Sequence, residues 1–490
     1  MLIRELIQHR LDSSIKVFNR EGLRIADLQI KTEYQSIKQY LLDFHGESNG
    51  CVAIKQHKDY RYFLTMLACM EIGIPYIPMK HDYPMDRVEQ IKEDSKFTIL
   101  IDDTKIEELL NYKGKINSKL PEVAMDQIVY VIFTSGSTGR PKGVIIQRKA
   151  LENFFAFINE DFPAVTDQDK LLQVAEFSFD QSVVDIALFL TKNVTLHFSN
   201  FENNIFKMGF EIETHRISVL NTVPNTLNMF LSDLVADRMD YTCLQHLFLG
   251  GARFSHGLYI KCQHYFKKNV DIYNLYGPTE ATVYCHVKKV SYHELNDCFE
   301  GNVSIGHPLK GVTAHIVLDG QIAPANVRGE LYIGGIQLMR EYINNPGQTS
   351  KALVHFNDET YYRSGDLAFK SEKNEFFIVG RSDDTIKYRG FRINLLDIDS
   401  YISRISYVQD SVTLAIPNEL TENQTLGFII LKEPKSIKEI KKDLAVLLLD
   451  YQIPEKIIFV DKYPTNVSGK VCKNTLKAQY LESLNKVKND

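Results

Sequence analysis

A short stretch rich in glycine and hydroxylated residues has the composition of an anion-binding loop. It lies between the β-forming run 128–133 and an apolar run that begins at Val144, and its small residues are Thr134, Ser135, Gly136, Ser137, Thr138 and Gly139. Such a loop offers backbone N–H groups and hydroxyls to an anion, and Lys142 adds a charge that suits phosphate. It differs from a Walker loop, because Pro141 precedes the lysine and Gly143 follows it. The stretch predicts a polyphosphate-binding loop; the alternative is a surface hairpin rich in turn-forming residues.

A second group of polar residues follows another strand-like run. Asn274, Tyr276, Thr279 and Glu280 stand around a Gly-Pro turn. Such a turn would bring an aromatic ring, a hydroxyl and a carboxylate into one cleft. In a chain that also has a phosphate-binding loop, this combination indicates a nucleotide site.

Together these motifs resemble those of the adenylate-forming enzymes, the superfamily of acyl-CoA ligases, luciferases and nonribosomal peptide synthetase adenylation domains. The phosphate loop of that family reads T-S-G-S/T-T-G-x-P-K-G, and every fixed position is present here. The resemblance covers residues 10 to 475 and extends to amino-acid adenylation domains and D-alanine–carrier protein ligases. It implies ATP and Mg²⁺ as cofactors.

The resemblance also implies a role for each matching residue. Tyr276 would stack on adenine, Asn274 would meet its exocyclic amine, and Thr279 would contact the α-phosphate. Glu280 would hold magnesium, which commonly binds one or two carboxylates together with substrate phosphates. Asp366 would accept hydrogen bonds from both ribose hydroxyls, unless it is only a turn residue. The other implied nucleotide-binding residues, besides the loop and Lys142, are Gly250, Gly251, Ala252, Ile378 and Arg381.

The main catalytic role falls on Lys470, in a Ser-Gly-Lys segment that matches the family. A carboxylate that attacks the α-phosphorus of ATP meets like charge, and two unit charges at ~4 Å repel by roughly 4 kcal/mol at an effective dielectric of 20. A lysine that bridges both groups offsets this repulsion and fixes the approach. The alternative for a single lysine near a C-terminus is a solvated surface side chain.

Asp180, in a Phe-Asp-Gln-Ser segment, bears on which acid is activated. Family members that activate α-amino acids carry Phe-Asp-x-Ser here, and their aspartate binds the α-ammonium group. A buried carboxylate is compensated only when an amine is present, so it would select amino acids over fatty or aryl acids. The structural alternative is a helix N-cap before residues 181–190.

The resemblance also implies a pocket for the substrate side chain, whose residues are assigned because they stand at the positions that line this pocket in the family. Its residues are Gln181, Val184, Asn221, Leu247, Leu249, Leu275, Val283 and Tyr284. In the family, the positions of Leu249 and Leu275 often carry small residues. Two leucines there would make the pocket shallow, which would favour a substrate with a small side chain: glycine, alanine, serine, threonine or valine. Asn221 is a candidate to bind a substrate hydroxyl.

Composition argues against several other classes of protein. The chain has 490 residues, of which 44% are apolar and 24% charged, as in globular proteins with two or more domains. A net charge of −5 without a dense Lys/Arg cluster gives no sign of a nucleic-acid surface. No apolar run reaches the length of a membrane span, and Arg4 and Glu5 are unlike a signal peptide. The seven scattered cysteines, without Cys-x-x-Cys spacing, indicate reduced thiols in the cytoplasm.

Periodic patterns predict the elements that would position these residues. Helices are predicted over 59–71, 85–93 and 151–158, and a strand over 97–101. Four further strand candidates, 194–198, 217–222, 244–249 and 270–276, alternate with helical segments, which implies parallel pairing in an α/β fold. Ligands bind at the carboxyl ends of strands in such sheets, where several of the polar residues lie. Short strands with Gly and Pro turns over 300–380 predict a small β-rich subdomain.

We therefore predict an α/β protein with two parts. Residues 1–382 would form a large multi-subdomain N-terminal region of layered sheets and helices, and residues 383–490 a small, mobile α+β C-terminal lid. The resemblance puts the hinge near Asp383, because a rotating lid can exchange the residues needed for adenylation and for thioester formation. Gly390, without a Cβ, would leave room for a pantetheine arm.

The predicted reaction converts ATP and an α-amino acid into aminoacyl-AMP and pyrophosphate. The aminoacyl group would then pass to the phosphopantetheine thiol of a separate carrier protein, since no carrier motif follows Lys470. Neither a nucleic acid nor a membrane is expected as a partner. The alternatives are an acyl- or aryl-CoA ligase of the same superfamily and a non-catalytic nucleotide-binding scaffold. The intact Lys142, Glu280, Asp366 and Lys470 argue against the scaffold.

Overall fold

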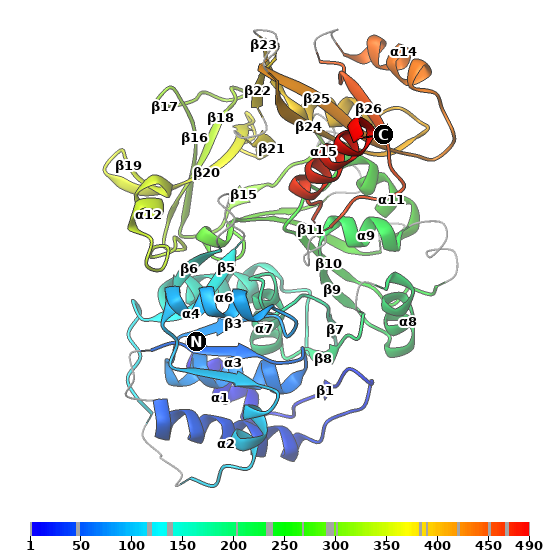
Figure 1. The fold of residues 1–490 in the computed structure, drawn as a ribbon. Helices are drawn as coiled ribbons and strands as arrows, with labels where there is room; N and C mark the ends of the chain where they lie inside the picture. Colours follow the sequence, from blue (N-terminus) through cyan, green and yellow to red (C-terminus); the bar gives the residue numbers. More distant parts are fainter. Residues whose placement is uncertain are drawn as a thin grey trace. The chain divides into compact units, whose positions relative to one another are not determined.

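The computed structural model covers most of the chain (Figure 1). It describes residues 2–489 except 46–49, 115–119, 135–140, 202–203, 232–238, 267–268, 291–297, 300–301, 382–384, 389–390, 419–421, 449–451 and 466–469. Two compact units are distinguished. The first comprises Met1–Glu294, Ile305–Ala314 and Tyr332–Ser364, and the second comprises Leu295–Ser304, His315–Leu331 and Gly365–Asp490. The predicted hinge residue Asp383 lies outside the described residues, so the division at 382 stays a prediction.

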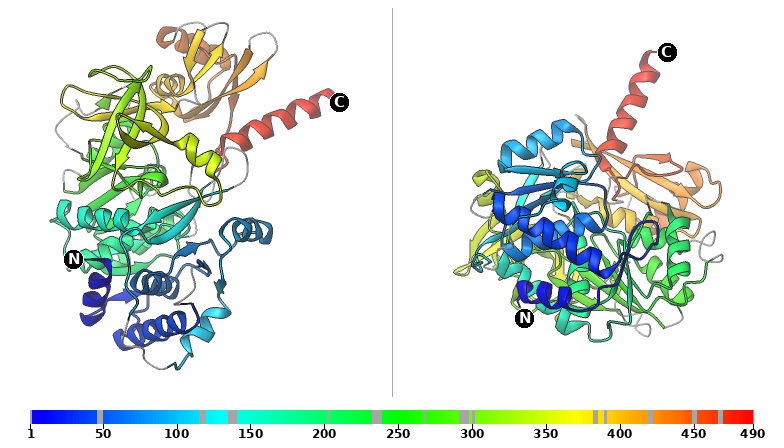
Figure 2. Two further views of the ribbon diagram at one scale, coloured as in Figure 1. Left: turned by 90° about the vertical axis from the view of Figure 1, so that its left-hand side faces the viewer. Right: turned by 90° about the horizontal axis from the view of Figure 1, so that it is seen from below.

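The first sheet of the first unit has the strand order β4-β2-β3-β5-β6. Its strands are β2 (Val52–Lys55), β3 (Tyr76–Pro78), β4 (Ile99–Asp102), β5 (Ile128–Thr134) and β6 (Lys142–Gln147). All pairs are parallel except β5 with β6. The surrounding helices are α1 (Ile3–Asp12), α2 (Asp27–His45), α3 (Tyr60–Ile72), α4 (Met85–Ser95) and α5 (Lys105–Leu110). Helix α3 contacts both α1 and α2 (Figure 2).

Helix α3 shows how local signals set the boundaries of an element. The predicted helix over 59–71 is confirmed to within one residue. The Asp59 side chain accepts a hydrogen bond from the Arg61 backbone N–H at 2.6 Å, which caps the N-terminus. Gly73 ends the helix in the left-handed conformation, with φ of 82°, where glycine has no Cβ penalty.

The second sheet of this unit has the order β1-β8-β7-β9-β10-β11-β12-β15. Its strands are β1 (Val17–Phe18), β7 (Lys170–Gln173), β8 (Thr195–Phe198), β9 (Val219–Thr222), β10 (His246–Gly250), β11 (Asp271–Tyr276), β12 (His286–Lys289) and β15 (His307–Pro308). The pairs from β1 to β11 are parallel, which confirms parallel pairing for the predicted strands β8 to β11 and adds β1 and β7, which were not predicted. The pairs of β12 with β11 and β15 are antiparallel. The carboxyl ends of β9, β10 and β11 therefore lie at one edge.

Helices of the same unit separate these strands along the chain. They are α6 (Arg148–Asp161), α7 (Ser182–Lys192), α8 (Ile205–His215), α9 (Pro224–Phe230) and α11 (His256–Phe266). Leu151, Phe154, Phe155 and Ile158 of α6 are at most 1% exposed. The aromatic stripe on α6 is thus core packing, as its helical spacing predicts.

A third sheet, in which β17 with β16, β19 with β20 and β21 with β20 pair in antiparallel fashion, confirms the predicted β-rich region. Its order is β17-β16-β18-β20-β19, and β21 pairs with β20. The strands are β16 (Val312–Leu318), β17 (Gln321–Ile322), β18 (Gly329–Gly335), β19 (Leu353–Phe356), β20 (Glu359–Lys370) and β21 (Phe376–Arg381), and α12 (Pro346–Ala352) precedes β19.

The C-terminal part of the second unit is a small α+β fold. It contains the hairpin β22 (Thr385–Tyr388) and β23 (Phe391–Asn394), the sheet β24 (Val408–Asn418), β25 (Glu422–Leu431) and β26 (Lys456–Phe459), and the helices α13 (Leu395–Ile402), α14 (Ile437–Leu447) and α15 (Lys473–Asn489). Ile398, Ile402, Ile440 and Leu444 are fully buried in its core. The predicted fold class, a large N-terminal α/β region followed by a small C-terminal α+β region, is confirmed.

Two composition-based predictions also have structural counterparts. The cysteines whose side chains are described carry free thiols, and all of these except Cys472 are buried. Within the described part of the chain, no helix has both the length and the apolar character needed to cross a bilayer.

Candidate active site

The predicted phosphate loop connects two paired strands. Thr134 at the end of β5 is opposite Lys142 at the start of β6, and Phe133 is opposite Gly143. A Cβ at Gly143 would lie 2.6 Å from Ile343 Cγ2 and 2.8 Å from Phe133 Cζ, so the close packing here requires glycine. The predicted strand–loop–strand arrangement is confirmed at both flanks. The loop residues Ser135, Gly136, Ser137, Thr138 and Gly139 lie outside the described residues.

Lys142 and Glu280 meet around Tyr342. The Lys142 Nζ donates a hydrogen bond to Gln348 Oε1 at 3.2 Å and lies 5.4 Å from the centroid of the Tyr342 ring, within cation–π range. The Tyr342 hydroxyl donates to Glu280 Oε1 at 2.6 Å. Burial and the Glu280 charge raise the pKa of Tyr342, so its hydroxyl remains protonated and can donate. The lysine and the carboxylate, 138 residues apart in sequence, thus share one site.

A strained turn follows Glu280. Thr279–Ala281 form a short 3₁₀ helix, after which Thr282 and Val283 have φ angles of 57° and 66°. Such angles are unfavourable for β-branched residues and persist only when the surroundings hold them. The Gln337 side chain, 1% exposed, does so. Its Nε2 donates to Thr282 O at 3.1 Å and Tyr284 O at 3.0 Å, and Thr282 Oγ1 donates to Gln337 O at 2.6 Å.

The predicted adenine-binding residues lie at the ends of neighbouring strands. Leu249 is opposite Asn274 in the β10–β11 pair, so the Gly250–Gly251–Ala252 turn lies beside the end of β11. Gly251 has a φ of 76°, which favours glycine. A Cβ at Gly250 would collide with the Tyr284 hydroxyl, so the missing side chain is what lets Tyr284 pack there. The sheet therefore brings these residues together.

The predicted pocket residues are buried, but they do not share one face of the sheet. Val184, Asn221, Leu247, Leu249, Leu275, Val283 and Tyr284 are at most 2% exposed. Phe248 is opposite Asn221 and Leu275 is opposite Gly250, so Asn221 and Leu275 lie on one face, whereas Leu247 and Leu249 lie on the other because side chains alternate along β10. The register therefore contradicts the prediction that Leu247 and Leu249 line the same pocket as Asn221. Gln181 Nε2 donates to Asn221 Oδ1 at 3.3 Å, and Asn221 Nδ2 donates to Gln181 O at 3.0 Å. The first turn of α7 is therefore tied to strand β9.

Asp180 lies close to this group and does not occupy the N-cap position of α7. The helix begins at Ser182, and its N-cap residue is Gln181, whose side chain makes no capping hydrogen bond. Burial, followed by the charge of Asp180, raises the pKa of Tyr130 and of Tyr284. The Oδ2 atom of Asp180 is itself buried, as are the hydroxyls of both tyrosines.

A buried carboxyl group, Asp185, was not predicted from the sequence. It is fully buried, and it accepts hydrogen bonds from Asn221 Nδ2 at 2.9 Å and from Gln173 Nε2 at 3.3 Å. Burial raises the pKa of Asp185 to about 7. An aspartate in the apolar segment 182–190 is a signal that could have identified it, because such residues are rarely buried without partners. The Asn221 amide is thus already engaged by Asp185 and Gln181.

The remaining predicted residues belong to the second unit. Asp366 on β20 is opposite Arg381 on β21, and Ala368 is opposite Ile378, with a β-bulge between Leu367 and Ala368. Asp366, Ile378 and Arg381 thus lie on one strand pair. Lys470 is exposed and lies between β26 and α15. The predicted hinge and thiolation residues Asp383 and Gly390 lie outside the described residues.

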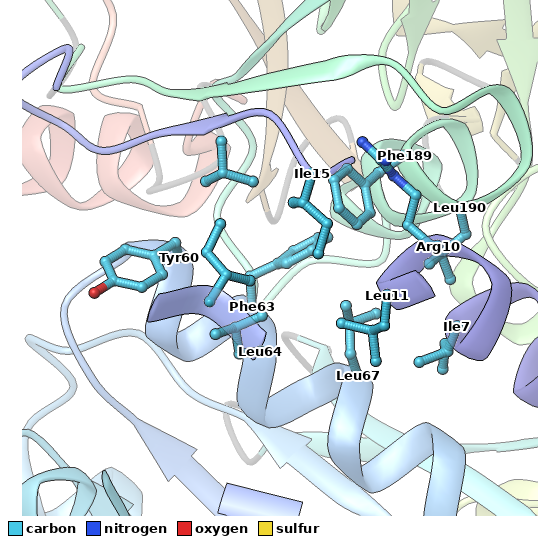
Figure 3. A pocket seen from close by; sticks show the side chains of 12 residues that line it. Ile7, Arg10, Leu11, Ile15, Tyr60, Phe63, Leu64, Leu67, Phe189 and Leu190 are labelled. Carbon is cyan, nitrogen blue, oxygen red and sulfur yellow. The ribbon is translucent and has the colours of Figure 1, made fainter. Parts of the chain in front are cut away.

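One small cavity is separate from these residues (Figure 3). It lies among α1, α3 and α7, is lined by apolar side chains such as Ile7, Leu67 and Leu190, and has a volume of about 10 Å³. Arg10 closes one side, with its guanidinium carbon 4.4 Å from the centroid of the Phe189 ring. A space of this size holds at most one water molecule, so it is a packing defect of the core.

The fold and these residues define an adenylate-forming enzyme. The chain belongs to the AMP-binding enzyme family, whose sequence model matches residues 29–343. It is 30% identical to tyrocidine synthase 3 from Brevibacillus parabrevis over 457 residues, which cover 89% of this chain and 7% of that protein. The chain therefore spans a small part of this relative. The resemblance to nonribosomal peptide synthetases seen in the sequence is confirmed.

Solved structures share the fold over nearly the whole chain. NpsA from Klebsiella oxytoca, in complex with 3-hydroxyanthranilyl-AMSN, superposes with a TM-score of 0.84 at 19% identity, covering 98% of this chain and 99% of its own. The o-succinylbenzoate CoA synthetase MenE from Bacillus subtilis, in complex with its acyl-adenylate intermediate, gives 0.80 at 19% identity, with 96% and 97% covered. At this level of identity the likeness establishes the fold.

Proposed function

We propose that this protein activates an α-amino acid with ATP and Mg²⁺. The products are aminoacyl-AMP and pyrophosphate, and the aminoacyl group is then transferred to the phosphopantetheine thiol of a carrier protein. The observation that carries this proposal is the location of Asp180, whose Oδ2 is buried and which directly precedes Gln181, the residue hydrogen-bonded to Asn221. A carboxylate in this environment suits the α-ammonium group of an amino acid.

The nucleotide end of the proposed site is supported by the cluster of Lys142, Tyr342 and Glu280. A carboxylate beside a lysine is a donor set that fits a magnesium–phosphate complex, and bound Mg²⁺ would neutralise charge on the phosphates. Glu280 would hold the ion, and Lys142 would neutralise a phosphate oxygen. The Tyr342 hydroxyl, bonded to Glu280 Oε1, would orient the carboxylate. Thr279, Asn274, Tyr276 and Asp366 keep the nucleotide roles that the resemblance implies.

Lys470 is the proposed catalytic residue of the adenylation step. Its ammonium group would bridge the substrate carboxylate and the α-phosphate, which lowers the repulsion between the two anions. An exposed side chain supports this role, because an ammonium group that remains hydrated keeps its charge. Asp383 and Gly390 remain the proposed hinge and thiolation residues.

The pocket favours a slim side chain on the substrate. Leu275 contributes apolar bulk on the face of the sheet that carries Asn221, and the amide of Asn221 is engaged by Asp185 and Gln181. These contacts support an apolar or very small side chain such as that of alanine or valine. That Asn221 binds a substrate hydroxyl stays a prediction, as does a cytoplasmic location.

Amino-acid-dependent exchange of pyrophosphate into ATP tests the proposal. All proteinogenic amino acids and their enantiomers are assayed, and we expect exchange with one or a few small ones. Asp180→Asn keeps the shape of the side chain but removes its charge, so we expect at least a hundredfold loss of kcat/KM for the amino acid, with ATP binding unchanged.

The control for Asp180→Asn is Asp167→Asn, an exposed aspartate in the loop before β7. Exchange with aryl or fatty acids that is insensitive to Asp180→Asn, followed by thioester formation with coenzyme A, would favour the CoA ligase alternative. If no carboxylic acid supports exchange, the scaffold alternative replaces the proposal.

A further inference from the structure

Three side chains of metal-ligand type lie together at the carboxyl edge of the first sheet. His57 follows strand β2, His81 follows β3, and Asp103 directly follows β4. These strands are adjacent and parallel, with β2 in the middle, so their carboxyl ends lie at the same edge. The fold thus collects three residues that are more than 20 positions apart in the sequence. Each belongs to the first unit, and none has a role in the proposed reaction.

One carboxylate oxygen is the centre of this cluster. Asp103 Oδ2 lies 2.7 Å from His57 Nδ1 and 3.3 Å from His81 Nε2. The two imidazole rings stack, with centroids 3.4 Å apart and planes inclined by 28°, so both direct a nitrogen to the same oxygen. The other oxygen of Asp103 accepts a hydrogen bond from the His57 backbone N–H at 3.0 Å, which fixes the carboxylate to the loop.

We propose that His57, His81 and Asp103 bind a divalent transition-metal ion of the Zn²⁺ type. Two imidazole nitrogens and one carboxylate oxygen suit zinc, nickel or copper, whereas magnesium prefers oxygen ligands. Ligand atoms around a tetrahedral zinc ion are about 3.3–3.6 Å apart, given bonds of about 2.0–2.2 Å. The three ligand atoms already lie within 4.8 Å of one another, so small side-chain rotations would let them surround an ion.

The surroundings support metal binding. The side chains of His57, His81 and Asp103 are 58%, 43% and 45% exposed, which lets an ion enter and lets water complete its coordination. The nearby Asp102 carboxylate is engaged elsewhere, because its Oδ1 accepts hydrogen bonds from the backbone N–H groups of residues 104 and 105.

A bound ion would tie together the loops after three strands of the first sheet. It would stabilise the folded chain by mass action, because the unfolded chain does not hold the ligands together. Its binding is independent of the proposed adenylation, since Lys142, Glu280 and Asp180 belong to other segments. The site therefore predicts a metal-dependent stability, in addition to the magnesium requirement of the proposed reaction.

Titration of the full-length, metal-stripped protein with Zn²⁺ tests the proposal. Calorimetry should show one equivalent bound by these residues, and thermal unfolding should shift to higher temperature. His57→Gln and His81→Gln should each weaken binding by at least about tenfold and remove the thermal shift. Asp103→Asn retains an oxygen for the His57 backbone N–H but loses the charge, so it should also weaken binding.

His264→Gln is the matched control, because His264 is an exposed histidine on α11. This variant should bind Zn²⁺ as the wild type does. The absorption spectrum with Co²⁺ should lack a thiolate-to-metal band, which separates this site from binding by cysteines. The proposal is overturned if the wild type binds no stoichiometric zinc, if His57→Gln and His81→Gln bind it unchanged, or if the Co²⁺ spectrum shows thiolate ligation. If a variant fails to fold, the anomalous signal of zinc in wild-type crystals decides: a peak between the three side chains supports the site, and its absence there refutes it.

Discussion

The two sides of the candidate site in the first unit are built differently. The phosphate side, formed by Lys142, Tyr342 and Glu280, presents half-buried charges. The acid side is formed by Asp180, Asn221 and Asp185 with the apolar pocket residues. Its hydrogen-bonded pair of Asn221 and Asp185 is fully buried. Charges that meet a hydrated nucleotide must stay accessible, whereas a selective pocket needs polar groups fixed in advance by hydrogen bonds. Substitutions on the two sides should therefore separate activity from stability.

The largest effect on activity is expected at Lys470, which would act on the same phosphates as the phosphate side. Lys470→Ala should lower pyrophosphate exchange by about 10²–10³-fold, as the loss of one electrostatic group in a transition state does. Because Lys470 is exposed, the free energy of unfolding should change by less than about 0.5 kcal/mol. Exchange kinetics, ATP binding by calorimetry and urea unfolding measure these quantities. Near-normal exchange would contradict the role, and Lys462→Ala is the exposed control on the same segment.

Asp185 should show the opposite behaviour, a loss of stability with a smaller effect on chemistry. Asp185→Ala removes one acceptor from the Asn221 amide and one from the Gln173 amide, which keep only Gln181 O and Ala175 O, so it should cost about 1–3 kcal/mol of unfolding free energy for each N–H left unpaired. The KM for the amino acid should rise, while the KM for ATP should not. Asp185→Asn, which keeps an oxygen, should lose less. Equal stability of Asp185→Ala and the wild type would contradict the claim that the buried polar groups of the acid side stabilise the folded chain.

The same residue predicts a dependence of stability on pH. The pKa of Asp185 is raised from 3.8 to about 7 in the folded state, so between these values the folded chain binds more protons than the unfolded chain. Its contribution to stability is fully present below about pH 4 and is lost as the pH rises toward 7. In Asp185→Asn this part of the decline should be missing. Urea unfolding at pH 5 and pH 8 would reveal it, and identical pH slopes in the two proteins would contradict the raised pKa.

Gln337 connects the two sides through the strained turn at Thr282 and Val283. Gln337→Ala removes the two hydrogen bonds that its Nε2 donates, which should cost about 1–3 kcal/mol of unfolding free energy. Because the turn carries Val283 and Tyr284 of the pocket, the KM for the amino acid should rise more than the KM for ATP. Gln168→Ala, at an exposed glutamine, is the control. A rise in the KM for ATP alone would assign the turn to the phosphate side.

The smallest effect is expected at Tyr342. Tyr342→Phe removes one hydrogen bond to a carboxylate, a loss of about 1.5–3 kcal/mol at most, and leaves the ring under Lys142 in place. The concentration of Mg²⁺ needed for half-maximal exchange should rise about tenfold, which corresponds to the lower end of this range. Titration of Mg²⁺ at saturating ATP measures it. A change in amino-acid selectivity instead would contradict the assignment of Tyr342 to the phosphate side.

Much of the fold was predictable because its signals are local. The start and end of α3 follow from Asp59 and Gly73, and the alternation of strands and helices predicts that β8 to β11 pair in parallel, although not that β7 lies between β8 and β9. Strand β7 was missed although β8 and β9 have the same length, because its sequence Lys-Leu-Leu-Gln contains no β-branched or aromatic residue that would indicate a strand. The placement of Asp180 outside the N-cap position of α7 also needed the structure, since an aspartate before a helix has the same sequence pattern in either case.

The sequence by itself determined the family and the chemical type of the site, because the phosphate loop and the residues around Glu280 and Asp180 are contiguous motifs. Tertiary structure alone decided which distant side chains support them. Tyr342 reaches Glu280 across 62 residues, and Asn221 reaches Asp185 across 36. Such contacts depend on strand order and packing, which no local pattern encodes. The meeting of His57, His81 and Asp103 at one edge has the same cause, since parallel strands align their carboxyl ends regardless of the sequence between them.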